Sequence, residues 1–109
     1  MEAAEAARAA GMRIVAGAPN LVRGGSQSGN IAVRDLLAAR LVDILASDYV
    51  PHSMLDAAFM ISADPGLDYD LPSAVAMVTR SPALAGGLTD RGAIETGLKA
   101  DLIRVDLYD

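Results

Sequence analysis

The chain has 109 residues, of which 52% are hydrophobic, and it carries a formal net charge of −5 without any cysteine. This composition is typical of one soluble globular domain, excludes a disulfide-stapled scaffold and predicts a reducing compartment, the cytoplasm. Because acidic residues outnumber basic ones and neither a Lys/Arg cluster nor a long apolar run occurs, we expect no nucleic-acid surface and no membrane span.

The first half of the chain alternates between helical and strand patterns. An alanine-rich segment ends at Gly11, where a glycine is typical of a helix C-terminus. The run "MRIVA" is short and mostly apolar, which favours a strand covered on both faces. We expect a helix at 2–10, a strand at 12–16, a loop at 17–30, a helix at 31–40 and a second strand at 43–47.

The second half is mainly helical in pattern. We expect a helix starting near Pro51, one capped by Asp70, one from Ser81 to the Gly86–Gly87 pair, and a last strand at 102–105. Strands and helices that alternate with short connections predict an α/β fold with a parallel sheet. The strands at 12–16 and 43–47 should then be parallel neighbours joined by the helix between them.

Asp48 stands directly after the second expected strand. In parallel α/β folds, ligands gather at the carboxyl ends of the strands, so the functional interpretation of Asp48 is a metal ligand or general base. A turn former or helix cap ahead of Pro51 explains the same residue. The spacing alone leaves both interpretations open.

A second candidate site is the "RGGS" stretch formed by Arg23, Gly24, Gly25 and Ser26. Glycines let backbone N–H groups turn toward an anion, and an arginine can clamp two of its oxygens, so a phosphate group fits such a loop. An ordinary Gly-Gly turn beside a solvated arginine has the same pattern. The loop follows the first strand and should therefore reach the same sheet edge as Asp48.

Three stretches carry a family resemblance: "GAPNLVRGGSQSGN", "DILASDYVP" and "LPSAVAMVTRSPALAGGLTDRGAIETGLKADLIRVD". In order and spacing they resemble the C-terminal end of the phosphonate-metabolism diphosphatases of the carbon–phosphorus lyase pathway, which belong to the amidohydrolase superfamily. The resemblance runs over nearly all of the chain. One position differs, because Gln27 stands where the family usually has a histidine.

The resemblance implies a metal-dependent (β/α) barrel hydrolase. Residues 1–86 would be the C-terminal part of the barrel, its last two strand–helix units, and residues 87–109 would return to a strand of the small β domain. The implied reaction cleaves α-D-ribose 1-methylphosphonate 5-triphosphate, a phosphorylated ribosyl phosphonate, to the 5-phosphate and diphosphate with a divalent, zinc-like metal.

The resemblance also assigns roles to the two candidate sites. Asp48 would be the last-strand aspartate that binds the metal and handles the proton of the attacking water. Arg23, Gly24, Gly25 and Ser26 would face the phosphate or phosphonate of the substrate. The superfamily's other metal ligands lie on earlier strands, and the single histidine here, His52, is expected to face solvent. We therefore expect this chain alone to bind metal weakly and to be inactive.

Two hypotheses follow. The chain is a segment of such a diphosphatase, or it is a non-catalytic, self-associating module derived from an amidohydrolase. Two strands cut from a barrel leave unpaired sheet edges, which favour pairing with another chain. We therefore expect a homo-oligomer under either hypothesis.

Overall fold

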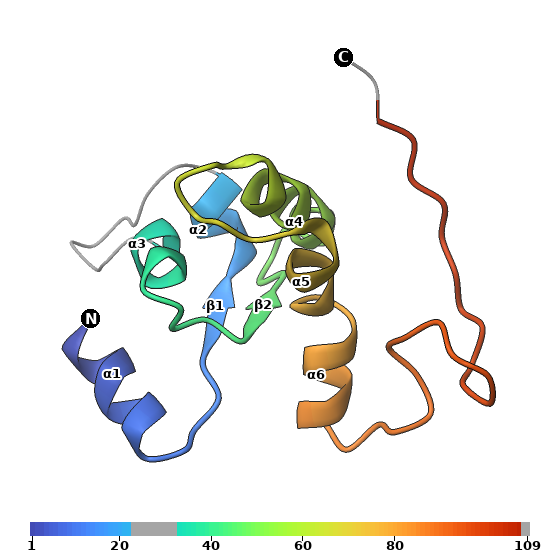
Figure 1. Cartoon of the computed structure of the whole chain (residues 1–109), viewed down its shortest axis with the longest axis horizontal. Coiled ribbons are helices and arrows are strands. Elements are labelled where there is room, and N and C mark those ends of the chain that lie inside the picture. The colour runs from blue at the N-terminus through green and yellow to red at the C-terminus, as the bar shows by residue number, and fades with distance from the viewer. Residues whose placement is uncertain (23–32, 108–109) are drawn as a thin grey trace.

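The structure is a computed structural model of the chain, and it describes residues 1–22 and 33–107 (Figure 1). The helices and strands found there alternate along the first half of the chain, as expected of an α/β fold. In chain order they are α1 (Glu2–Ala9), β1 (Val15–Gly17), α2 (Ala18–Val22), α3 (Val33–Ala38), β2 (Ile44–Ala46), α4 (Ser53–Ala63), α5 (Leu71–Ala76) and α6 (Arg80–Ala85).

The two strands form a parallel pair, which confirms the predicted neighbour relationship. Val15 lies opposite Ile44, and Gly17 lies opposite Ala46, so both strands end at the same edge. Helix α3 belongs to the connection between them. The described residues hold this one two-stranded sheet, so the remainder of the predicted barrel stays a prediction.

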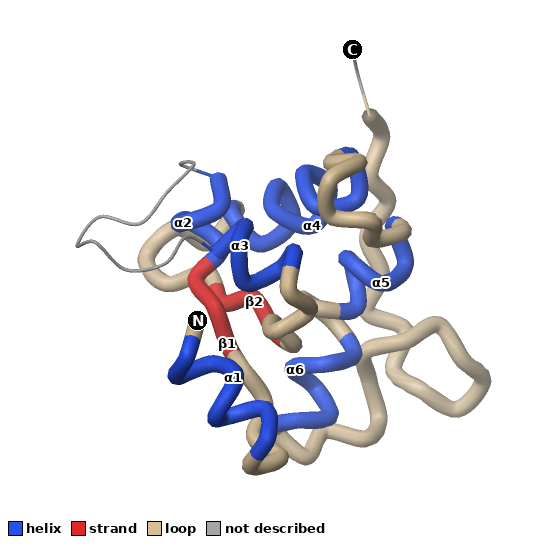
Figure 2. The backbone as a smooth tube through the Cα atoms, turned by 60° about the vertical axis from the view of Figure 1, so that its left-hand side comes forward, coloured by secondary structure: helices blue, strands red, loops and turns tan. Residues whose placement is uncertain are grey.

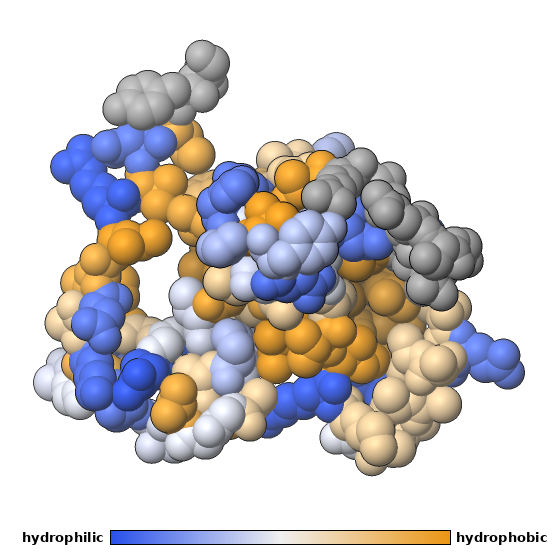
Figure 3. All heavy atoms as spheres, turned by 180° about the vertical axis from the view of Figure 1, so that it is seen from behind, coloured by the Kyte–Doolittle hydropathy of each residue, from blue (hydrophilic) through white to orange (hydrophobic). Residues whose placement is uncertain are grey.

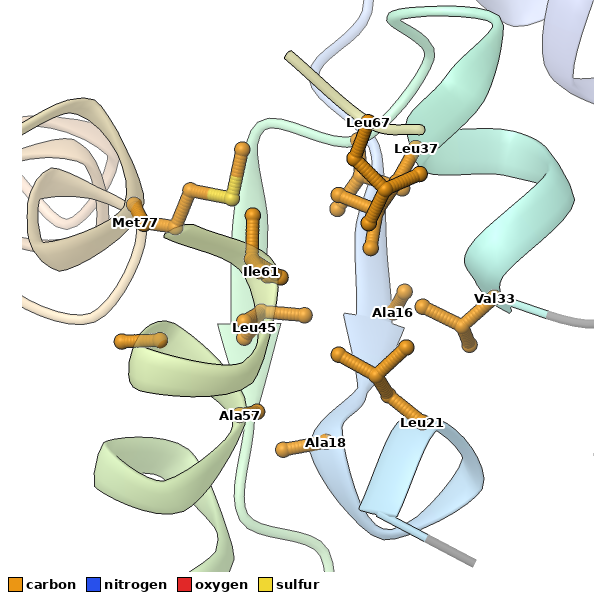
Figure 4. Packing of buried hydrophobic residues seen from close by; sticks show 13 residues of the cluster. Ala16, Ala18, Leu21, Val33, Leu37, Leu45, Ala57, Ile61, Leu67 and Met77 are labelled. Atoms are coloured by element: carbon orange, nitrogen blue, oxygen red, sulfur yellow. The ribbon is translucent and has the colours of Figure 1, made fainter. Parts of the chain in front are cut away.

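The core lies between the strands and the surrounding helices, which Figure 2 shows on several sides of the pair. Leu37 from α3, Leu45 from β2 and Ile61 from α4 are the largest apolar side chains that are fully buried (Figure 4). Burial of such a side chain contributes about 1.5–3 kcal/mol relative to leaving it in water. Helix α4 packs against both α2 and α5 and contributes Ala57, Ala58 and Ile61 to the core.

Several predicted helix ends are confirmed by the backbone geometry. Gly11, just after α1, has a φ of 78°, the left-handed conformation that glycine adopts most readily. The Asp70 side chain caps α5, with its Oδ1 accepting a hydrogen bond from the Ser73 backbone N–H at 2.8 Å. Gly86 is the C-cap of α6, at the glycine pair where the sequence predicts this helix to end. These signals depend only on neighbours in sequence.

Helix α2 differs from the prediction, because the sequence pattern predicts a loop at 17–30. Its Pro19 lies within the first turn, where a missing N–H costs no helical hydrogen bond. Ala18, Pro19 and Leu21 are buried, and the helix packs against α4. Burial of these apolar residues favours a helix despite the loop-like composition that follows.

The predicted strand at 102–105 is wrong for this chain. Residues 101–107 form neither strand nor helix, and all of them are exposed. A strand needs a neighbouring strand for its backbone hydrogen bonds, and neither β1 nor β2 pairs with this segment. Figure 3 shows the C-terminal segment standing off from the helical body across an open gap. The predicted division at residue 86 stays a prediction.

Within the described ranges, no helix is both long and apolar enough to cross a membrane.

Candidate functional site

The carboxyl ends of the two strands bring Gly17 and Asp48 together. Gly17 is the last residue of β1, and Asp48 follows the end of β2. A Cβ atom placed on Gly17 would overlap the Oδ2 atom of Asp48 and would lie 3.3 Å from its Cγ. The Asp48 carboxylate therefore lies against the end of β1, at the sheet edge where the sequence predicted a site.

The backbone of Asp48 adopts the left-handed conformation, with a φ of 50°. Aspartate and asparagine tolerate this region better than most residues other than glycine. The turn is closed by a 2.9 Å hydrogen bond from the Val50 N–H to the Ser47 carbonyl. The turn-former interpretation of Asp48 is therefore right for its backbone. The helix-cap interpretation is wrong, because His52 occupies the N-cap position of α4.

The Asp48 side chain is exposed to solvent. Among the described residues, no hydrogen bond or ion pair involves its carboxylate. The carboxylate of a purely structural aspartate usually accepts hydrogen bonds from backbone N–H groups or pairs with a cation, as those of Asp70 and Asp43 do here. As far as residues 1–22 and 33–107 are concerned, both carboxylate oxygens of Asp48 are available to a ligand.

Arg23, Gly24, Gly25 and Ser26 lie outside the described residues, and so does Gln27. Their predicted contact with an anion stays a prediction. On either side of this segment, the Asn20 Oδ1 accepts a hydrogen bond from the Val33 N–H at 2.9 Å. That bond ties α2, which follows β1 directly, to the first residue of α3.

The donor set tests whether these residues fit a metal ion. In the ranges 1–22 and 33–107, no group of three or more His, Cys, Asp or Glu side chains is arranged to hold one. His52 is exposed, as expected. A tightly held catalytic ion normally needs three protein ligands and an open position. The described residues by themselves do not form a metal centre. Asp48 could supply only one of the ligands that such a centre needs.

The resolved pKa shifts belong to surface groups that take part in ion pairs or in the cap of α5. A hydrogen bond from Arg34 lowers the pKa of Asp64, and the Gly66 N–H lowers it further. Arg91 lowers the pKa of Asp90 in the same way. These side chains are partly exposed, so solvent screens their ion pairs and the pairs contribute little to stability. The Arg34–Asp64 pair joins α3 to the residue after α4, and Arg91 pairs with its neighbour Asp90, so both pairs are surface ion pairs.

A hollow of about 820 Å³ lies elsewhere, between α5, α6 and the chain from Leu88 to Ile103. Its lining is mainly apolar, and Asp48 is not among the residues that form it. The most exposed of its apolar residues is Ile94, at 87%. This hollow is therefore separate from the site at the strand ends.

Gly17 is the residue of this site that the sequence analysis missed. The sequence pattern predicts that a loop begins at residue 17, whereas Gly17 is the last residue of β1. A glycine directly after an apolar run is the signal that marks a strand end where another group approaches closely. The approaching group, Asp48, becomes visible only in the folded chain.

With this geometry in place, comparison with known proteins identifies the class. The model of the amidohydrolase family matches residues 2–109, and the chain belongs to that family. It is also 54% identical over 102 residues to the alpha-D-ribose 1-methylphosphonate 5-triphosphate diphosphatase of Escherichia coli (strain K12). The match covers 94% of this chain and 27% of the relative's length. No solved structure matches the chain.

Proposed function

We propose that the chain acts as the segment of a metal-dependent diphosphatase that supplies Asp48 to the active site. The proposed reaction cleaves α-D-ribose 1-methylphosphonate 5-triphosphate to the 5-phosphate and diphosphate. The observation that carries this proposal is the 54% identity, over 94% of the chain, to a diphosphatase named for that substrate. This identity supports the hydrolase hypothesis over the non-catalytic module.

The geometry at the strand ends supports a role for Asp48 in that reaction. In (β/α) barrels, catalytic groups stand at the carboxyl ends of parallel strands, which is where Asp48 lies relative to β1 and β2. Its solvent-facing carboxylate is proposed to accept the proton of the attacking water and to donate one oxygen to the metal. The other ligands have to come from outside the described residues.

The substrate is proposed to meet the same edge of the sheet. Arg23, Gly24, Gly25 and Ser26 follow α2, which begins directly after β1. In this proposal they contact a phosphate or phosphonate oxygen, since both arginine and glycine N–H groups suit that chemistry. The cytoplasmic location expected from the composition remains part of the proposal.

A segment exchange tests the proposal. In the E. coli diphosphatase, the 102 matched residues are replaced by those of this chain, and diphosphate release from the triphosphate substrate is measured with divalent metal present. We expect the exchanged enzyme to release diphosphate and the 109-residue chain alone to remain at the buffer rate, because it lacks a ligand set.

The control for this experiment is the melting curve of the exchanged enzyme. An exchanged enzyme that unfolds at the temperature of the parent but releases no diphosphate contradicts the proposal. A variant with Gln27→His restores the residue that the family usually carries. If the exchanged enzyme releases no diphosphate but its Gln27→His variant does, the loss of activity is due to Gln27, and the proposed role of Asp48 stands.

A further inference from the structure

Gly17 is a glycine for a reason other than backbone conformation. The described glycines with a positive φ are Gly11, Gly87, Gly92 and Gly97, and Gly17 is not among them. An L-residue would therefore adopt its backbone angles without strain. What an added side chain would meet is the Asp48 carboxylate. The missing side chain provides space.

The group that occupies this space is the far end of a flexible side chain. Asp48 Oδ2 is the nearest atom to a Cβ on Gly17, and its Cγ and Oδ1 follow at 3.3 and 3.7 Å. No backbone atom is among these three contacts. A methyl group at residue 17 can therefore be accommodated by rotating the carboxylate away, with little change in the fold.

The backbone of Asp48 cannot easily move to relieve the overlap with a larger residue at position 17. It comes two residues after β2 and lies in the turn closed by the Val50 to Ser47 hydrogen bond, with a φ of 50°. Few other backbone conformations satisfy this turn. The response to a larger residue at position 17 is therefore confined to the side-chain torsions of Asp48.

We propose that Gly17 is a positioning residue, whose missing side chain lets the Asp48 carboxylate lie across the end of β1. The functional part of this inference rests on the proposed role of Asp48 in hydrolysis. The structural part, that residue 17 sets the torsion of Asp48, does not depend on it. Gly17 itself touches no reacting atom in this scheme.

The structural part is tested on the 109-residue chain by NMR. Three-bond couplings from the backbone N and carbonyl carbon of Asp48 to its Cγ report the first side-chain torsion. We expect Gly17→Ala to change these couplings while the melting temperature stays within a few degrees of wild type. Unchanged couplings in Gly17→Ala overturn the inference.

Gly86→Ala is the matched control. Gly86 has a φ of −85°, and the nearest atoms to an added Cβ are carbonyl oxygens at 3.5 and 3.7 Å, an ordinary contact. We expect the Asp48 couplings to be unchanged in this variant. A similar change in both variants overturns the inference, because the effect would then be a general response to the loss of a glycine.

The functional part is tested in the exchanged diphosphatase described above. Substitution of a residue that orients a catalytic group typically lowers activity by roughly 10- to 100-fold, and we expect a loss of kcat in that range for Gly17→Ala. The melting temperature of the exchanged enzyme should stay unchanged in Gly17→Ala, because only the Asp48 side chain is displaced. A purely structural residue would lower the melting temperature together with the rate.

The outcomes separate the two proposals. If Asp48→Asn abolishes turnover while Gly17→Ala leaves kcat unchanged, the positioning role is wrong and the proposed function stands. If Asp48→Asn leaves turnover unchanged, the proposed role of Asp48 is wrong, and so is the functional part of this inference. The NMR couplings then still decide whether residue 17 sets the torsion of Asp48.

Discussion

The backbone N–H of Leu45 donates a hydrogen bond to the Met77 carbonyl oxygen across 3.1 Å. Leu45 lies in the middle of β2, and Met77 is the residue that ends α5. The outer edge of β2 is therefore partly covered by the chain's own backbone. Within residues 1–22 and 33–107, no comparable backbone hydrogen bond lies on the outer side of β1, whose Val15 is 57% exposed. Of the two sheet edges that the sequence predicted to be unpaired, the edge of β1 is therefore the more open.

Self-association is therefore predicted to involve β1. We expect light scattering to give a mass above the 11.2 kDa of the monomer. A lysine on an edge strand discourages edge-to-edge pairing, so Val15→Lys should shift the chain to the monomer. Ile94→Lys is the control, because Ile94 is exposed but lies outside the strands. A wild-type mass of one chain at all concentrations would refute the prediction.

The carboxylate of Asp48 is predicted to be essential for diphosphate release in the exchanged enzyme. Asp48→Asn keeps the side-chain shape and tolerates the left-handed backbone, but it removes the charge and the proton acceptor. We expect loss of turnover with an unchanged melting temperature. Asp68→Asn is a close control, because Asp68 is also exposed and has a φ of 54°. Equal activity in the two variants would count against the role given to Asp48.

Leu45 is predicted to be a main source of stability, and the C-terminal segment is not. Leu45 is 2% exposed, and Leu45→Ala should lower the free energy of unfolding by about 2–5 kcal/mol. Leu102 is 61% exposed, and Leu102→Ala should change it by less than about 0.5 kcal/mol. Denaturant titration measures both. A large loss with Leu102→Ala would mean that the segment packs in solution.

The cap of α5 is predicted to make stability depend on pH. Hydrogen bonds from the Ser73 side chain and backbone N–H lower the pKa of Asp70. Because the folded pKa lies below the unfolded one, the stabilisation is complete above the unfolded pKa and is lost as the pH falls through the folded pKa. Asp70→Asn keeps a cap but has no charge to titrate.

The measurement is the melting temperature of wild type and Asp70→Asn from neutral pH into the acid range. We expect the difference between them to shrink as the pH drops below the usual carboxyl range. A difference that stays constant over that range would show that the charge of Asp70 contributes nothing to the cap. An increase in the difference on acidification would reverse the predicted sign.

The sequence by itself determined the features that depend on near neighbours. Gly11 marked the end of α1, Asp70 marked the start of α5, and Asp48 was recognised as the residue following a strand. The strand, helix, strand order also predicted the parallel pair, because a short crossover constrains the direction of the second strand. The family resemblance was likewise readable from the spacing of motifs.

Tertiary structure decided what depends on distant segments. Helix α2 forms where its apolar residues meet α4, and the expected strand at 102–105 is absent because no neighbouring strand supplies hydrogen bonds. The approach of Asp48 to Gly17 arises because parallel pairing brings the two strand ends to one edge. The residues next to it in sequence set the local conformation of a residue. Its contacts with distant segments form only when the chain packs into its tertiary structure.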